Sequence, residues 1–421
     1  MSKILIIGAG TEQIGVITEA KKMGHFVVVS DFNPNAPGIP FADKFYEVST
    51  TDGEGNANVA RKENVDGVLT VCSETAVPTV AYVADQLHLP SFSKKTALLA
   101  TNKSEMRKAL NFHQVRVAPF VIASKFSHCQ AFCAKENGPW VVKPVDSSGQ
   151  RGTNIVDTED QLENAFNLAV ENSYTGEALI DRFVIGPEVH VTMHVIKNQV
   201  HFLAISDRIT LGKENFGIAV RHISPSILED KIEKEIKDMC IRGVQAIGLE
   251  NGVATCELII EKGTPYVMEL AVRVPGGYLR DVALLQSGVD LNKTTIWTSL
   301  GDYKSFTEIV TEPIYASNSV KFISSSNLER GPKIIPFVPD YRHLLNDNIK
   351  LINFHFTGAF TIPELHSSVG RFGAIIAVGN NRKEAVINSE EVFNQIKINE
   401  KSLIEYKNYS EFNVDFKSYF N

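Results

Sequence analysis

Two acidic residues on neighbouring predicted strands are the strongest chemical feature of the sequence. Residues 254–277 contain two apolar strands around a polar hairpin, and the strands carry Glu257 and Glu269. Because side chains alternate between the two faces of a strand, acids on paired strands can point the same way. Two buried carboxylates are costly side by side unless a cation lies between them, and hard oxygen ligands suit Mg²⁺. The pair therefore predicts a magnesium site, and a surface hairpin with two solvated acids is the alternative.

A cationic side chain and a turn follow the second acid. Arg273 lies four residues after Glu269, and a Pro-Gly-Gly turn at residues 275–277 ends the segment. Anionic oxygens, a metal ion and a fixed guanidinium are the groups that phosphoryl transfer needs. The segment therefore favours chemistry on a phosphate.

A second group of residues has the properties of a phosphate site. Lys143 lies within an apolar predicted strand, where an unpaired ammonium group is costly to bury. Residues 147–152 follow as a glycine-containing turn whose backbone N–H groups can approach phosphate closely, although the Walker A pattern is absent. A plain hairpin turn is the alternative. Lys103 lies in the middle of a predicted helix over residues 96–111, where a solvated lysine is the ordinary interpretation.

Two further polar segments are candidates for substrate contact. Ser73 and Glu74 follow the predicted strand 65–71, at the carboxyl end where α/β sheets bind ligands, although Ser73 as a helix N-cap is the simpler interpretation. Residues 205–226 predict an irregular polar segment, which is either a surface loop or a loop that covers a substrate. The candidate residues in it are Lys213, Arg221 and His222.

The elements that must hold these residues begin with a parallel sheet. Residues 3–10 predict a strand, residues 11–24 a helix and residues 25–33 a second strand, and the alternation continues. This pattern predicts a doubly wound parallel sheet. NAD binding is a minor alternative, because Gln13 stands where the dinucleotide-binding motif requires its third glycine.

Composition limits the class of protein. The chain has 421 residues, enough for two or three domains, and its net charge of −7 argues against a nucleic-acid partner. No apolar run approaches the roughly 20 residues that span a bilayer, and the N-terminal apolar run lacks a signal-peptide cleavage site. The five cysteines are scattered without a CxxC pair, which predicts reduced thiols, a cytoplasmic location and no zinc site.

Five motifs in order resemble the ATP-grasp superfamily of carboxylate–amine ligases, and the likeness covers most of the chain. The motifs are TNKSEMRKAL, VVKPVDSSGQRGT, ALIDRFVIGPEVHV, CELII and MELAVRVPGG. The resemblance implies an α/β chain with an ATP-grasp fold, α+β in its nucleotide lobes, and an N-terminal Rossmann-like parallel-sheet domain. It implies a pre-ATP-grasp domain at 1–100, a small lobe with a phosphate flap at 101–183, and a large lobe with the metal site and a C-terminal extension at 184–421.

The resemblance also implies a role for each matching residue. The lysines would hold the ATP phosphates under the loop 147–152, the backbone of residues 182–184 would hold the adenine, and Glu188 would bind the ribose. The implied ATP-binding residues are Lys103, Lys143, Ser147, Ser148, Gly149, Arg182, Phe183, Val184 and Glu188. The implied ligands of Mg²⁺, with Mn²⁺ as the alternative metal, are Glu257 and Glu269. The implied catalytic residues are Arg273, His222 and Lys143.

Within the superfamily the chain is most similar to single-copy L-amino-acid (dipeptide) ligases, because His222 matches their substrate-loop histidine. The implied reaction joins a small-molecule carboxylate to an amine through an acyl phosphate, with release of ADP and phosphate, in a homodimer without nucleic-acid or membrane partners. Two positions depart from the family pattern: Ala271 replaces the usual asparagine of the metal motif, and Ala219 and Val220 replace an acid before the histidine. A purine-pathway ligase, a carboxylase-type enzyme and an ATP-binding protein without activity are the alternatives.

Overall fold

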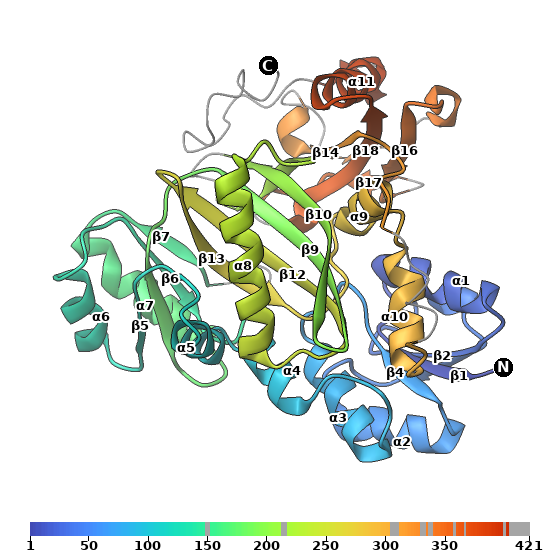
Figure 1. The fold of residues 1–421 in the computed structure, drawn as a ribbon, viewed down its shortest axis with the longest axis horizontal. Coiled ribbons are helices and arrows are strands. Elements are labelled where there is room, and N and C mark those ends of the chain that lie inside the picture. Colours follow the sequence, from blue (N-terminus) through green and yellow to red (C-terminus); the bar gives the residue numbers. More distant parts are fainter. Residues whose placement is uncertain are drawn as a thin grey trace.

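The computed structural model describes residues 1–147, 152–211, 217–303, 311–328, 334–335, 340–356, 359–365, 368–398 and 401–403. The three largest sheets of these residues are a parallel sheet at the N-terminus, a small antiparallel sheet and a large antiparallel sheet (Figure 1). None of the described helices is both long and apolar enough to cross a membrane.

The N-terminal sheet is parallel, as the alternating pattern predicts, with the strand order β3-β2-β1-β4. Its central strand is apolar and buried because helices cover both faces. The strands are β1 (Lys3–Ile7), β2 (Phe26–Asp31), β3 (Lys44–Glu47) and β4 (Gly67–Leu69), and the helices are α1 (Ile14–Lys22), α2 (Gly53–Glu63) and α3 (Val77–Leu87).

The side chain of Gln13 occupies the space beside the glycine turn that follows β1. The Gln13 amide Nε2 donates to the Val71 carbonyl oxygen at 2.6 Å, and a Cβ added at Gly10 would lie 3.0 Å from Gln13 Oε1. The Gln13 side chain therefore lies against the turn where the dinucleotide motif would place a glycine.

Glu63 at the end of α2 contacts strands β1 and β3 of this sheet, and these contacts give a stability prediction. Its carboxylate contacts Lys44 at 2.6 Å and Tyr46 at 2.5 Å, and these two hydrogen bonds lower the pKa of Glu63 from 4.5 to about 2. The stabilisation is therefore complete above pH 4.5 and is lost as the pH falls towards 2. We expect Glu63→Gln to lower the Tm by a few degrees at pH 7 and by less at pH 3, measured by calorimetry. Glu47→Gln, at an exposed position on β3, is the control, and an equal loss of Tm at both pH values would contradict the assignment.

The large sheet has eight antiparallel strands in the order β13-β12-β9-β10-β11-β14-β18-β16. Helices α4, α5 and α8 cover one face of its β13-β12-β9 end and close an apolar core there (Figure 1). The strands are β9 (Glu188–Ile196), β10 (Gln199–Thr210), β11 (Ala219–Ser224), β12 (Gly252–Glu261), β13 (Thr264–Ala271), β14 (Ser317–Ser324), β16 (Ile349–Phe354) and β18 (Arg371–Gly379), and the helices are α4 (Lys94–Thr101), α5 (Lys103–Phe112) and α8 (Asp230–Ile247).

Two sequence predictions are wrong in this region. The single helix predicted over 96–111 is two helices, because the Asn102 side chain accepts a hydrogen bond from the Glu105 N–H and caps α5. Lys103 is consequently the first residue of a helix and not a mid-helix residue. The irregular segment predicted over 205–226 is mostly β10 and β11, both largely buried.

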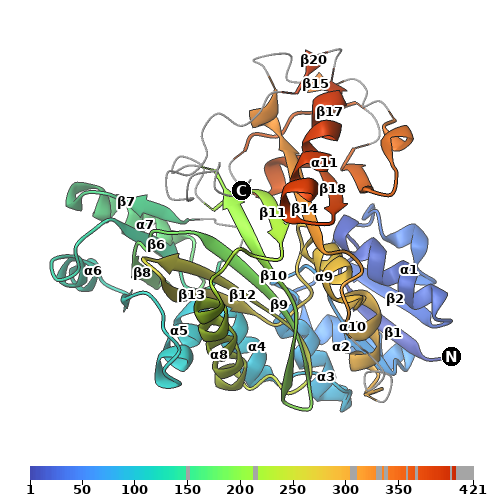
Figure 2. The ribbon, with the colours of Figure 1, turned by 45° about the horizontal axis from the view of Figure 1, so that its top comes forward.

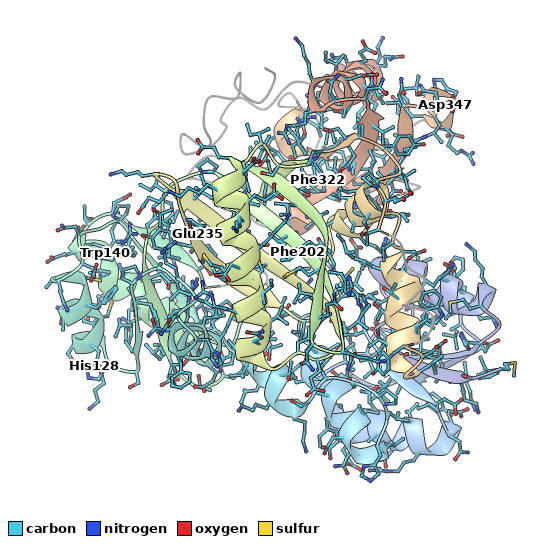
Figure 3. The ribbon with its side chains drawn as sticks, viewed as in Figure 1. His128, Trp140, Phe202, Glu235, Phe322 and Asp347 are labelled. Atoms are coloured by element: carbon cyan, nitrogen blue, oxygen red, sulfur yellow. The ribbon has the colours of Figure 1, made fainter. Side chains whose placement is uncertain are left out.

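The small sheet, with the order β5-β8-β6-β7, lies at the left of Figure 1, where Figure 3 labels Trp140 of β6. It joins the large sheet at Gly186, where an added Cβ would lie 2.0 Å from the Ile260 carbonyl oxygen. Only glycine allows this approach. The elements are β5 (Phe120–Ala123), β6 (Trp140–Pro144), β7 (Asn154–Val156), β8 (Ala178–Arg182), α6 (Phe126–Cys133) and α7 (Leu162–Glu171).

Helices α9 (Leu279–Ser287) and α10 (Leu291–Ser299) lie between the N-terminal sheet and the large sheet (Figure 2). Their apolar residues share one core with β1, β2 and β14, so the two sheets are packed together. Helix α11 (Arg382–Gln395) packs on β14 and β18. Short strands complete the described elements: β15 (Ile334–Ile335), β17 (Phe360–Thr361), β19 (Lys397–Ile398) and β20 (Lys401–Ser402).

Candidate active site

The two acids of the hairpin lie directly opposite each other. Strands β12 and β13 are joined by a two-residue turn, and Glu257 pairs with Glu269. Leu258, however, pairs with Val267, so Met268 is an extra residue in β13. Without this bulge Glu257 would face Met268, and Glu269 would point to the opposite side of the sheet, because a one-residue shift reverses the faces. The bulge is therefore what brings the two carboxylates together.

Further polar side chains share this face of the sheet. Glu257 also pairs with His190 on β9, and Arg208 on β10 pairs with both Glu188 and His222. Since residues opposite each other or two apart point the same way, all these side chains face one side. The polar face consists of Glu188, His190, Arg208, His222, Glu257 and Glu269. The opposite face of the same strands packs under α8.

Two cavities open on the polar face and meet at the acids. The first, of about 360 Å³, is lined by Lys103, Lys143, Ser147 and Glu188, with an apolar wall that includes Ile259 and Met268. The second, of about 230 Å³, is lined by His190, His222, Ala271, Leu279 and Arg371. Both are lined by Arg208, Glu257, Glu269, Arg273 and Ser368. The sequence candidates from five separate motifs therefore meet at one place.

Lys143 is held by a buried carboxylate on the neighbouring strand. Its Nζ lies 2.7 Å from Asp181 Oδ2, and Arg107 lies 3.5 Å from the same oxygen. Burial opposes the ionisation of Asp181, but Arg107 and Lys143 together hold the pKa of Asp181 below its usual value. Burial lowers the pKa of Lys143, and the neighbouring Arg107 lowers it further, while Asp181 opposes both effects. The residual positive charge favours an anion in the first cavity.

Lys103 reaches the first cavity because α5 begins there. Its backbone N–H donates to the Val145 carbonyl at 2.7 Å, and its Nζ donates to the Ser147 carbonyl at 2.5 Å. The lysine is thus fixed at the end of β6, where the predicted phosphate loop begins. Ser148 and Gly149 of that loop, and Lys213 of the predicted substrate loop, lie outside the described residues.

Arg273 contacts an acid from the N-terminal sheet. Its Nε donates to Glu74 Oε2 at 2.7 Å, and neither side chain is more than about one-fifth exposed. Ser73 is not the N-cap of the following helix, because α3 begins at Val77 with Ala76 as its N-cap residue. The segment after β4 therefore contributes Glu74 to the site and does not provide the N-cap of α3.

His222 is buried against Phe322 of β14, labelled in Figure 3, with ring centroids 5.4 Å apart. Arg371 stacks on the same ring, with its guanidinium carbon 4.0 Å from the centroid. Burial, together with Arg208, holds the pKa of His222 well below 6.5. Burial and the same arginine lower the pKa of His190 to about 3. Both imidazoles are therefore neutral at pH 7 in this conformation.

Some candidates do not meet at the cavities as the sequence suggested. Arg221 points away from His222 and lies beneath α11, where it contacts Ser319, Ser389 and Glu390. Arg182 forms a two-fold ion pair with Glu261 at 2.9–3.0 Å, and its guanidinium stacks on Tyr266.

The backbone predicted to hold adenine is partly engaged by the protein. The N–H groups of Arg182 and Phe183 donate to the carbonyls of Pro119 and Pro139, both at 2.9 Å. Within residues 182–184, the backbone groups left for the predicted adenine contacts are therefore the Val184 N–H and the carbonyl oxygens. The apolar residues Val184 and Ile259 pack together beside Tyr266 and Met268.

The donor set at the junction fits a hard divalent cation. Glu257 and Glu269 offer carboxylate oxygens on facing strands, and among the described residues no group of three or more histidine, cysteine or acidic side chains is arranged to hold a metal ion without other ligands. A magnesium ion commonly uses one or two carboxylates, with water and phosphate oxygens as its other ligands. Ala271 lies on the same face of β13 as Glu269 and adds no oxygen.

Arg208 and Asp181 are site residues that the sequence interpretation missed. Arg208 lies at the centre of the polar face, where it contacts Glu188 and the Gly217 carbonyl. Each is a charged residue within an apolar strand, which is the signal that identified Lys143. The same criterion applied to every predicted strand would have found Asp181 but not Arg208, which lies in the segment 205–226 that the sequence predicts to be irregular.

Comparison with known proteins gives a family match over part of the chain. Residues 100–277 match the family model described as an ATP-grasp domain. A formate-dependent phosphoribosylglycinamide formyltransferase from Hydrogenovibrio crunogenus (strain DSM 25203 / XCL-2) is 27% identical over 44% of this chain and 47% of its own length. The chain thus spans about half the length of this relative.

Two solved structures share the fold over nearly the whole chain. Phosphoribosylglycinamide synthetase from Anaerococcus prevotii has a TM-score of 0.78 at 20% identity and covers 94% of this chain and 99% of its own. L-amino acid ligase from Bacillus licheniformis has a TM-score of 0.77 at 23% identity and covers 94% of this chain and 98% of its own. The predicted ATP-grasp fold with an N-terminal parallel sheet is confirmed.

Proposed function

The chain carries an ATP-grasp domain over residues 100–277, and from this premise we propose that it is an ATP-dependent carboxylate–amine ligase that acts on amino acids. One observation carries the proposal: Glu257 and Glu269 face each other where a cavity with two lysines meets a cavity with two histidines. In this proposal a nucleotide binds on one side of the acids and a second substrate binds on the other.

The first cavity is the proposed ATP site. Lys103 and Lys143 would hold the phosphates, and Ser147 begins the loop that would cover them. Glu188 is the proposed ribose ligand, and the apolar wall with Ile259 and Met268 suits a purine base. A magnesium ion bound to Glu257 and Glu269 would offset the charge of the triphosphate and of an approaching carboxylate.

The second cavity is the proposed substrate site. A carboxylate held there would attack the γ-phosphate of ATP, giving ADP and an acyl phosphate, and an amine would then displace phosphate to form the amide. Arg273 lines both cavities and would stabilise charge on the transferred oxygens. His222 is neutral and would orient the substrate through hydrogen bonds instead of charge.

Amino acids are the proposed substrates because the second cavity is small and holds arginines for a carboxylate. Arg208, Arg273 and Arg371 line its 230 Å³. A ribotide ligase is the second candidate, favoured by similarity to two enzymes whose names contain phosphoribosylglycinamide. ADP release measured against separate panels of amino acids and amino-ribotides tests the choice. Release with ribotides alone would replace the amino-acid proposal, and ATP binding without release in either panel would favour a protein without ligase activity.

Lys143→Met is expected to weaken ATP binding by about 10- to 100-fold, the range for a charged hydrogen bond to phosphate. Lys108→Met is the control, because that lysine is exposed on α5 and pairs only with Glu105 among the described residues. Calorimetric titration with a non-hydrolysable ATP analogue measures the effect. Equal affinities for the two variants would remove Lys143 from the phosphate site.

The domain division at residues 100 and 183 remains a proposal, as does the homodimer. Helices α4 and α5 pack with α8 against one face of the large sheet. The proposed small lobe contains the sheet β5 to β8 and contacts that core. Light scattering of the purified protein would give the oligomeric state.

A further inference from the structure

We propose that Glu74 is a positioning residue, which holds the Arg273 guanidinium at the junction of the two cavities and away from Glu269. The inference rests on the proposed ligase function and gives the N-terminal sheet a part in the reaction. Glu74 itself is not proposed to contact the reacting atoms.

The contact between Glu74 and Arg273 is direct and largely buried. Glu74 Oε2 accepts from Arg273 Nε at 2.7 Å, and the side chains are 17% and 21% exposed. The residues are 199 positions apart, so only the packing of the N-terminal sheet against the hairpin brings them together. Both line the first cavity, and Arg273 lines the second as well.

Two neighbouring contacts fix the same pair of segments. The Cys72 N–H donates to the Val274 carbonyl at 3.0 Å, and Cys72 Sγ lies 3.3 Å from the Pro275 carbonyl oxygen. The segment after β4 and the segment after β13 are therefore joined at three points. A shift of Glu74 would move Arg273 with it.

The charges explain why this position needs an acid. Arg273 lies four residues after Glu269, and both line the two cavities. Besides Glu74, Glu269 is a carboxylate whose charge acts on the Arg273 guanidinium, and it is proposed to bind the metal. Glu74 supplies an alternative acceptor, so that Glu269 keeps its oxygens for the cation and Arg273 stays at the junction.

The test compares Glu74→Gln with Glu74→Asp and with Glu63→Gln, which changes an acid at the end of α2 whose ion pairs are with Lys3 and Lys44. We expect Glu74→Gln to lower kcat by about 100-fold, as for a displaced catalytic group, with the KM for ATP changed by less than about three-fold. Glu74→Asp should recover part of the loss, and Glu63→Gln should leave kcat unchanged. Adding Glu74→Gln to an Arg273→Met variant should have little further effect, because the two residues act as one unit.

A binding measurement separates this inference from the proposed function. Mn²⁺ titrated in the presence of ADP and followed by electron paramagnetic resonance should bind about 10-fold more weakly to Glu74→Gln, because Arg273 would then engage Glu269. Unchanged kcat and Mn²⁺ affinity in Glu74→Gln, or the same losses in Glu63→Gln, would overturn the inference. A wild-type protein that releases no ADP with any substrate would overturn the proposed function instead, and the Mn²⁺ titration would still decide the role of Glu74.

Discussion

Glu269→Gln is expected to lower the rate of ADP release by at least about 10³-fold, which corresponds to about 4 kcal/mol in the activation barrier. The amide keeps the size of the side chain but removes one of two facing negative charges at the junction of the cavities. With one carboxylate left, the proposed cation site loses half of its protein charge. Coupled-enzyme assays at saturating ATP, with the best substrate of the panel, measure the effect.

Glu235→Gln is the matched control for this substitution. Glu235 lies on α8, on the opposite side of the same sheet, where it contacts Arg116 at 2.6 Å (Figure 3). It should keep wild-type turnover, and raising the Mg²⁺ concentration should partly restore Glu269→Gln but not a protein that is misfolded. Turnover of Glu269→Gln within a few-fold of wild type would end the assignment of the metal site.

Arg273→Met is expected to reduce kcat by about 10³-fold, since an arginine that meets charge on a transferred phosphoryl group is worth about that much. The affinity for ATP should change little, because Lys103 and Lys143 hold the other phosphates in the proposal. Arg273→Lys should recover only part of the activity, as an ammonium group lacks the planar fork that a guanidinium offers.

The control for the arginine is Arg242→Met, which removes a guanidinium from a surface ion pair on α8. Rapid-quench measurement of the first turnover separates the chemical step from product release. An unchanged first turnover in Arg273→Met, with loss only in later turnovers, would contradict a role at the phosphoryl group.

Much of the fold can be predicted from the sequence, because apolar residues alternate with polar ones in half-buried strands and run continuously in fully buried strands. Strand β1 is a continuous apolar run, and the N-terminal sheet is parallel. The site was harder to predict, because face assignment depends on register. Counting from the two-residue turn, a regular hairpin would have separated Glu257 from Glu269, and only the extra residue Met268 reverses that outcome. The residue preferences of this segment do not predict such a bulge.

The remaining differences come from one local helix cap and from contacts between distant parts of the chain. Residues 96–111 have continuous helical periodicity, yet the side chain of Asn102 caps a new helix and turns Lys103 towards Ser147. Glu74 binds Arg273, which lies 199 residues further along the chain. The cap by Asn102 is a local contact over three residues, whereas the Lys103–Ser147 and Glu74–Arg273 contacts join distant parts of the chain and cannot be predicted from one segment alone.

The central claim is that the facing carboxylates of Glu257 and Glu269 hold a divalent cation between a nucleotide and a second substrate. A crystal soaked with Mn²⁺ and a non-hydrolysable ATP analogue tests it directly through the anomalous signal of the metal. We expect a peak between the two carboxylates, with the triphosphate beside Lys103 and Lys143. A nucleotide bound with no metal peak within ligand distance of either acid would contradict the claim.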